Sequence, residues 1–174
     1  NLPFFCYNLP TCTNIEITVE LMKKLQDNVP QLTGLKHSAP NFHNIRAFSS
    51  MGLATFTGSC HWMLPAMTTG AVGCVDGPPN IAPEHWVIIW KAFQDGKIDE
   101  ARKAQESAST LSDALIKLFG GSRYVAICKH VLSRRLGIDC GDPRKPALPL
   151  SGDQRIEIDR ILEQLELPAV PKPI

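Results

Sequence analysis

Two residues of this chain, Lys36 and Tyr7, carry side chains that together could perform carbonyl chemistry. Lys36 lies within the apolar segment Thr33–Ser38. If this segment is a buried strand, the amine of Lys36 is in contact with little solvent. An amine attacks a ketone only when it is neutral, and a lysine with the ordinary pKa of about 10.4 is almost entirely protonated at pH 7. Burial disfavours the charged form and can turn such a lysine into a Schiff-base nucleophile. The alternative is a lysine that extends to water at the strand end.

Tyr7 lies 29 residues before Lys36, which is about the length of one strand–helix–strand unit. The two residues are therefore expected on adjacent parallel strands, about 4.8 Å apart, near the carboxyl ends. Barrel enzymes place their chemistry at that edge. A phenol beside an imine could relay protons there, whereas the alternative is an ordinary aromatic side chain at a strand end.

The elements that must position these residues alternate along the first part of the chain. Short apolar segments alternate with helical ones, which predicts a parallel sheet covered on both faces. A doubly wound open sheet and a (β/α)8 barrel both fit, but a glycine-rich nucleotide-binding motif is missing from the sequence. A full barrel needs about 250 residues, so four units are half of one. The predicted strands are Leu2–Tyr7, Thr33–Ser38, Leu53–Ser59 and Ala71–Val75.

The second part of the chain has a helical pattern almost to its end. A serine at position 151, with Gln154 three residues later, forms a capping box that begins the last helix. We predict an α/β fold in three parts: the C-terminal half of a (β/α)8 TIM barrel at 1–95, a small C-terminal helical cluster at 96–167, and a loose proline-rich tail at 168–174. The predicted helices of the second part are Pro83–Asp95, Ile98–Phe119, Arg123–Leu136 and the helix from Ser151.

Composition excludes several classes of protein. The 174 residues carry a net charge of +1 without a basic or acidic block, which argues against nucleic-acid and membrane-surface partners. Apolar runs stay well short of the roughly 18 residues of a membrane helix. The six cysteines form no CxxC pair and the five histidines show no zinc spacing. We therefore expect a cytoplasmic protein with reduced thiols, no metal and no cofactor.

Six segments, in this order, resemble the dihydrodipicolinate synthase and N-acetylneuraminate lyase family of class I, pyruvate-dependent aldolases. The resemblance covers nearly the whole chain, and the ordered set is specific although no single motif is decisive. The segments are Tyr7-Asn8-Leu9-Pro10, Gly34-Leu35-Lys36-His37-Ser38, Thr57-Gly58, Leu64-Pro65, Gly70-Ala71-Val72-Gly73 with Val75 and Asn80 after it, and 125–136 with 142–150.

The resemblance implies a role for each matching position. In the family the lysine forms an imine with pyruvate and the tyrosine shuttles protons, which makes Lys36 the nucleophile and Tyr7 the proton relay. Ser38 points the same way as Lys36 along the strand and is expected to contact substrate. Two further positions are expected to offer backbone to the ligand and two to contact its hydroxyl groups; they are Gly58 and Val75, and Asp76 and His61, respectively.

Three departures from the family pattern bear on the substrate. Cys12 stands where the synthases carry an arginine, which argues against that condensation. Cys60 and His61 stand where the sialic acid lyases carry Asp-Glu, and Asp76 replaces the glycine of a Gly-Ser pair. We expect a carbon–carbon lyase, N-acetylneuraminate lyase-like, acting on a hydroxylated keto acid. The alternatives are a 2-keto-3-deoxy sugar acid dehydratase, a dihydrodipicolinate synthase-like condensing enzyme, or a non-catalytic half-barrel module.

The family's Gly/Thr-rich motif, which ends in Gly-Glu and binds the pyruvate carboxylate, has no match in residues 1–174. The chain also begins directly with an apolar strand. We therefore expect these residues to be the C-terminal portion of a longer enzyme. Partners are expected to be pyruvate or a related 2-keto acid and copies of the same protein, as a homodimer or homotetramer.

Overall fold

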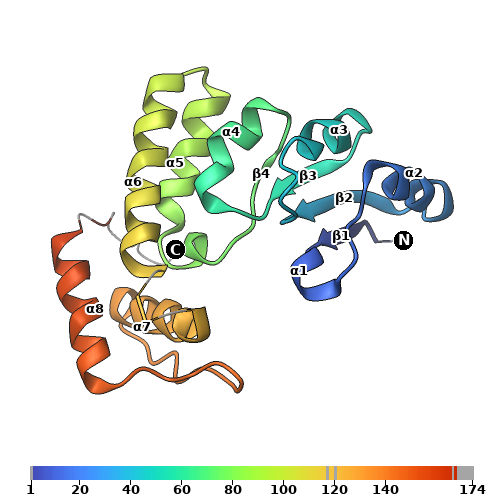
Figure 1. Ribbon diagram of the computed structural model, residues 1–174. Helices are drawn as coiled ribbons and strands as arrows, with labels where there is room; N and C mark the ends of the chain where they lie inside the picture. Colours follow the sequence, from blue (N-terminus) through green and yellow to red (C-terminus); the bar gives the residue numbers. More distant parts are fainter. Residues whose placement is uncertain (1, 117, 120, 166, 168–174) are drawn as a thin grey trace.

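The computed structural model describes residues 2–116, 118–119, 121–165 and 167, and it confirms the predicted parallel α/β fold (Figure 1). Four strands form one parallel sheet in the order β1-β2-β3-β4. They are β1 (Phe4–Asn8), β2 (Leu32–His37), β3 (Ala54–Thr57) and β4 (Gly73–Cys74). The last strand is shorter than predicted, although the backbone N–H groups of Val72 and Val75 on either side of it still bond to β3 carbonyls.

Helices follow each strand and then fill the rest of the chain. All the helices predicted for the second part of the chain are present, with ends shifted by a few residues; the short helix at Pro10–Thr13 and the 3-10 turns at Pro78–Asn80 and Gly121–Arg123 were not predicted. The serine at 151 and Gln154 form the predicted capping box at the start of α8. The helices are α1 (Pro10–Thr13), α2 (Val19–Asn28), α3 (Asn44–Ser50), α4 (Met63–Thr68), α5 (Pro83–Gln94), α6 (Ile98–Ile116), α7 (Tyr124–Leu136) and α8 (Gly152–Gln164), with 3-10 turns η1 (Cys60–Trp62), η2 (Pro78–Asn80) and η3 (Gly121–Arg123).

Helices cover one face of the sheet, where Leu35 of β2 packs with Met22 of α2 and Phe48 of α3, all fully buried. The opposite face carries Phe5 and Tyr7, which are 45% and 49% exposed. The expectation of cover on both faces is therefore wrong for the described residues. Strands in sequential order, joined by crossovers of one hand, place their helices on the same side. A doubly wound sheet needs a reversal of strand order, which these four strands lack.

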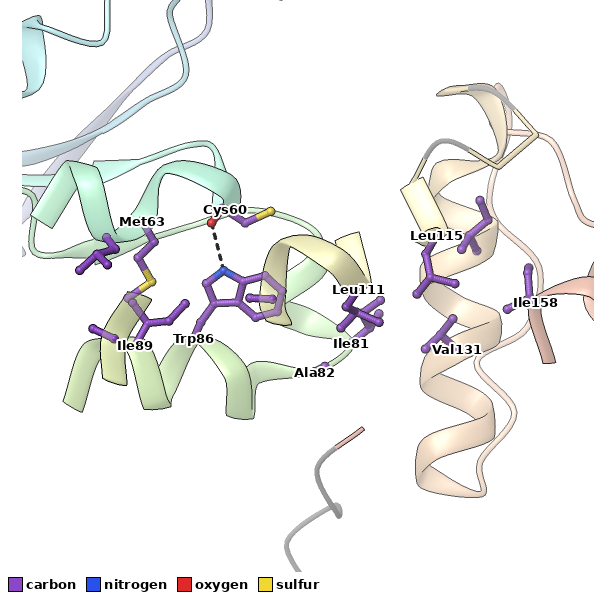
Figure 2. Packing of buried hydrophobic residues seen from close by; sticks show 14 of the residues in the cluster. Cys60, Met63, Ile81, Ala82, Trp86, Ile89, Leu111, Leu115, Val131 and Ile158 are labelled. Atoms are coloured by element: carbon purple, nitrogen blue, oxygen red, sulfur yellow. Dashed lines mark hydrogen bonds between the residues drawn. The ribbon is translucent and has the colours of Figure 1, made fainter. Parts of the chain in front are cut away.

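A second core joins the helices from α4 to α8 (Figure 2). Trp86, Leu111, Val131 and Ile158, from α5 to α8 in turn, are all buried in it. This core contains residues on both sides of position 95, and the predicted division there stays a prediction. The predicted tail, 168–174, lies outside the described residues. None of the described helices is long and apolar enough to span a bilayer.

Candidate active site

Tyr7 and Lys36 are direct neighbours in the register of β1 and β2, each one residue before its strand ends. Paired residues of parallel strands point to the same face, so both side chains lie on the face without helices. The Lys36 Nζ lies 4.1 Å from the centroid of the Tyr7 ring, a cation–π contact. The predicted adjacency is confirmed, whereas the catalytic roles stay predictions.

Ser38 extends the same arrangement beyond the end of β2. Its backbone N–H donates to the Asn8 carbonyl at 2.9 Å, and its Oγ donates to the Tyr7 hydroxyl oxygen at 3.5 Å. Gly58 lies against it, because a Cβ at that position would collide with the Ser38 side chain. The structure therefore brings Tyr7, Lys36, Ser38 and Gly58 together at the carboxyl ends of β1 to β3.

Two buried polar residues, Asn8 and His37, support this edge and were not assigned a role from the sequence. The Asn8 side chain donates to the Ile17 carbonyl at 3.0 Å and accepts from its N–H at 2.9 Å. Its Nδ2 lies 3.2 Å from His37 Nδ1, and His37 Nε2 lies 3.1 Å from the Asn41 carbonyl oxygen. A carbonyl only accepts, so Nε2 carries the hydrogen and Nδ1 accepts from Asn8.

The Asn8–His37 contact lies on the helix face of the sheet, because each residue follows a predicted catalytic residue by one position. It joins the ends of β1 and β2 directly behind Tyr7 and Lys36. Burial lowers the pKa of His37, which favours the neutral ring that these two hydrogen bonds require. A sequence signal existed, since polar residues at alternating strand positions must find partners when a helix covers them.

Asp76 and His61 make contacts within the protein. The Asp76 carboxylate accepts from the Cys60 N–H at 2.9 Å and from the Gly77 N–H at 2.7 Å. His61 Nε2 lies 3.5 Å from Asp113 Oδ1 on α6. These contacts tie the loops after β3 and β4 to each other and to α6. The proposed role of both side chains as substrate hydroxyl contacts stays a prediction.

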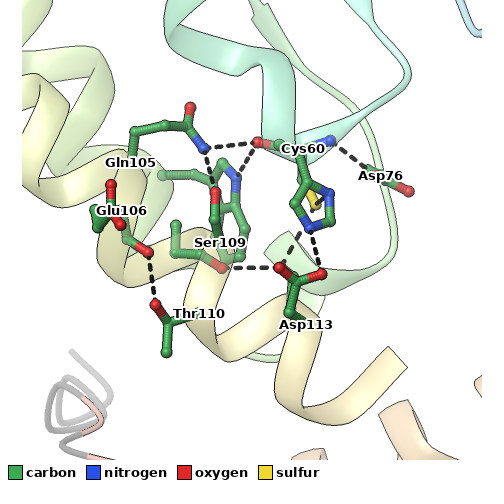
Figure 3. A network of polar contacts seen from close by, with 11 residues as sticks. Cys60, Asp76, Gln105, Glu106, Ser109, Thr110 and Asp113 are labelled. Carbon is green, nitrogen blue, oxygen red and sulfur yellow. Dashed lines mark hydrogen bonds and ion pairs between the residues drawn. The ribbon is translucent and has the colours of Figure 1, made fainter. Parts of the chain in front are cut away.

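The loop after β3 is held by two helices of the second part of the chain. The Cys60 carbonyl accepts from Gln105 Nε2 at 3.1 Å (Figure 3) and from Trp86 Nε1 at 3.3 Å (Figure 2). Gln105 Oε1 in turn accepts from the Leu64 N–H. Burial raises the pKa of the Cys60 thiol to about 12, so this cysteine is unsuited to act as a nucleophile. Val75, in the next loop, is 46% exposed, and its N–H bonds to β3.

The chain belongs to the dihydrodipicolinate synthetase family, whose profile matches residues 1–165. A 4-hydroxy-tetrahydrodipicolinate synthase from Archaeoglobus fulgidus is 26% identical over 170 residues, which cover 96% of this chain and 57% of that protein. An N-acetylneuraminate lyase from Mediterraneibacter gnavus is 26% identical, with 95% of this chain and 52% of that protein covered.

A solved structure gives the same relationship. The Sulfolobus 2-keto-3-deoxygluconate aldolase in complex with D-KDPG superposes with a TM-score of 0.80 and 26% identity, covering 93% of this chain and 53% of that one. The chain thus spans about half the length of the relatives it matches. The family includes both lyases and synthases that process small molecules.

The buried neutral ring of His37 predicts a pH dependence of stability. Because its pKa is lower in the folded protein than the unfolded value of about 6.5, its contribution is present above that value and is lost as the pH falls through the folded pKa. We expect His37→Gln to reduce the loss of unfolding free energy between pH 7.5 and pH 5, measured by urea denaturation at each pH. The control is Lys24→Gln at an exposed position on α2, which leaves the His37 hydrogen bonds in place and should keep the parent's dependence. Equal curves for parent and His37→Gln would contradict the prediction.

Proposed function

We propose that Lys36 is the Schiff-base nucleophile of a class I aldolase that acts on pyruvate or a related 2-keto acid. The observation that carries the proposal is the placement of the Lys36 Nζ over the Tyr7 ring at the carboxyl edge of a parallel sheet. Parallel α/β folds commonly place their catalytic groups at that edge. Membership of a family that includes an N-acetylneuraminate lyase and a keto-sugar-acid aldolase supports it.

The chemistry follows from the imine. The neutral Lys36 amine adds to the ketone carbon of the substrate, and the carbinolamine loses water to give a protonated imine. The bond between the α and β carbons of the imine then breaks. Its electron pair moves toward the imine nitrogen and leaves an enamine, while the β carbon, which carries the hydroxyl group, leaves as an aldehyde. The proton of the substrate hydroxyl must depart at the same time, and Tyr7 is the group proposed to accept and return it.

Ser38 fits this scheme as the partner of the Tyr7 hydroxyl. At 3.5 Å the two oxygens are at the limit of a hydrogen bond, so a substrate hydroxyl could displace or bridge them. Phe5 and Phe56, with ring centroids 6.1 Å apart, add apolar surface to the same face of the sheet.

We also propose that the sheet is the second half of a (β/α)8 barrel. The sequential parallel order, the helices on one face and the doubled length of the relatives all support this arrangement. The open edge at β4 adjoins an apolar groove that includes Val72, Val87 and Trp90, all more than 40% exposed. Further strand–helix units would cover this groove and supply the residues that bind the substrate carboxylate. Association into a homodimer or homotetramer stays a prediction.

Borohydride trapping tests the nucleophile. In the full-length protein incubated with pyruvate and borohydride, the peptide that contains Lys36 is expected to carry a reduced pyruvate adduct, which is read by mass spectrometry. Lys36→Arg should abolish the adduct, because a guanidinium stays protonated. Lys24→Arg, at an exposed lysine on α2, is the control and should leave it unchanged. An adduct on another lysine, or the absence of any adduct, would contradict the proposal.

The proton relay makes a separable prediction. Tyr7→Phe keeps the ring under the Lys36 amine but removes the hydroxyl that transfers protons. We expect kcat for carbon–carbon cleavage to fall by about 10² or more, the usual scale of general acid–base catalysis, while the trapped adduct still forms. Tyr7→Phe with full kcat would show that another group moves the proton.

A condensing enzyme that uses the same imine is the second candidate, because relatives such as the Archaeoglobus protein are named as synthases. The imine stabilises charge at the neighbouring carbon, and the second substrate decides whether a bond forms or breaks. We expect pyruvate to be released from N-acetylneuraminate or 2-keto-3-deoxygluconate, which coupled oxidation of NADH by lactate dehydrogenase measures. Adduct formation without release from any sugar keto acid would favour the condensing enzyme.

A further inference from the structure

We propose that a cavity between α5, α6 and the residues just after α8 binds a small organic cation, namely an ammonium or amidinium group on a short apolar chain. No residue of this cavity takes part in the reaction proposed for Lys36, so the inference stands apart from the proposed function. The cavity has a volume of about 270 Å³. Sites for small molecules usually measure roughly 300–1,000 Å³, so this one suits a ligand of few atoms.

His85 of α5 is the buried polar residue in the wall of this cavity. It is 8% exposed, and none of the hydrogen bonds among the described residues uses a nitrogen of its ring. Its ring makes an edge contact with Trp86, with ring centroids 6.2 Å apart. Burial lowers the pKa of His85, which favours the neutral ring with one donor and one acceptor nitrogen. Because buried polar groups normally have partners, this ring at a cavity wall points to a ligand.

The two hydroxyl groups of the cavity wall act as acceptors toward a ligand. Ser107 Oγ donates to the Lys103 carbonyl at 3.2 Å. Thr110 Oγ1 donates to the Glu106 carbonyl at 3.0 Å (Figure 3). A hydroxyl has a single hydrogen, so only its lone pairs remain for a ligand. Both side chains therefore favour a ligand that donates through N–H groups.

The charge of the cavity wall also favours a cation. Glu106 contributes a carboxylate, and none of the described residues that line the cavity is a lysine or an arginine. An anion would lack a cationic partner here, whereas an ammonium or amidinium group would find the carboxylate and the neighbouring acceptors. The rest of the wall is apolar and suits a short hydrocarbon chain. It consists of Leu111, Leu165 and Leu167.

The cavity lies where α5 and α6 are fixed to the loop after β3. Trp86 directly follows His85 in the sequence, and its indole N–H donates to the Cys60 carbonyl. Gln105 directly precedes Glu106, and its side-chain amide donates to the same carbonyl. The backbone that carries the two charged or titratable residues of the cavity is thus held in place before a ligand arrives. Such preorganisation lowers the entropic cost of binding.

Titration calorimetry of the full-length protein with three probes of equal chain length tests the site. The probes are n-butylammonium, 1-butanol and butyrate, which carry a positive charge, no charge and a negative charge. We expect n-butylammonium to saturate a single site. The other two probes should bind at least about tenfold more weakly, because they lack a charge that complements the carboxylate.

Two variants locate the binding. Glu106→Gln keeps the size of the side chain but removes its charge, and should weaken n-butylammonium binding about fivefold, the upper scale for a partly exposed ion pair. His85→Phe keeps a ring beside Trp86 but removes the accepting nitrogen, and should weaken binding by a similar factor of about five. The control is Glu157→Gln on α8, which removes the same charge from an exposed residue outside the cavity and should leave the affinity unchanged.

The proposal is overturned if n-butylammonium does not bind, if butyrate or 1-butanol binds as tightly, or if Glu106→Gln or His85→Phe binds the cation like the parent. Should His85→Phe fail to fold, Thr110→Val carries the same comparison, because it removes an acceptor at an exposed position. Pyruvate trapping on Lys36 is a separate measurement. A parent that binds the cation but forms no pyruvate adduct would support this site and contradict the proposed function.

Discussion

The candidate site depends on the register between β1 and β2. Tyr7 faces Lys36 because the two strands pair in parallel with these residues opposite each other. A shift of β2 by one residue would turn Lys36 into the helix layer and Leu35 out of it. Leu35 is fully buried against Met22 and Phe48, so the apolar packing behind the sheet fixes the placement of the amine in front. The residue that packs in the core and the residue proposed to react thus lie on opposite faces of the same strand.

Much of this could be predicted because strand periodicity and spacing are local. The distance of 29 residues between Tyr7 and Lys36 predicted their adjacency, and the apolar segments predicted a parallel sheet, now confirmed. The open face could not be predicted, because apolar residues such as Phe5 give the same pattern whether helices or further strands cover them. Strand ends also moved by a residue or two, since tertiary hydrogen bonds determine where a ladder stops.

The interaction partners of Asp76 and His61 could not be predicted from the sequence. A carboxylate just beyond a strand end can face a ligand or a neighbouring loop, and residue type does not distinguish the two. Here the partner of Asp76 is the N–H of Cys60, in another loop, and His61 meets Asp113 on a distant helix. Such pairs follow from how α6 packs across the loops, which no local pattern encodes.

The helices of the second part therefore act on the site through the loop after β3. Gln105 and Trp86 both donate to the Cys60 carbonyl, and Gln105 also accepts from the next turn. That loop begins with Gly58, which lies directly against the Ser38 side chain at the end of β2. The buried helical core thereby holds a loop that borders the candidate site. Packing in the second part of the chain thus positions backbone close to the residues proposed to react, although none of those helices supplies one of them.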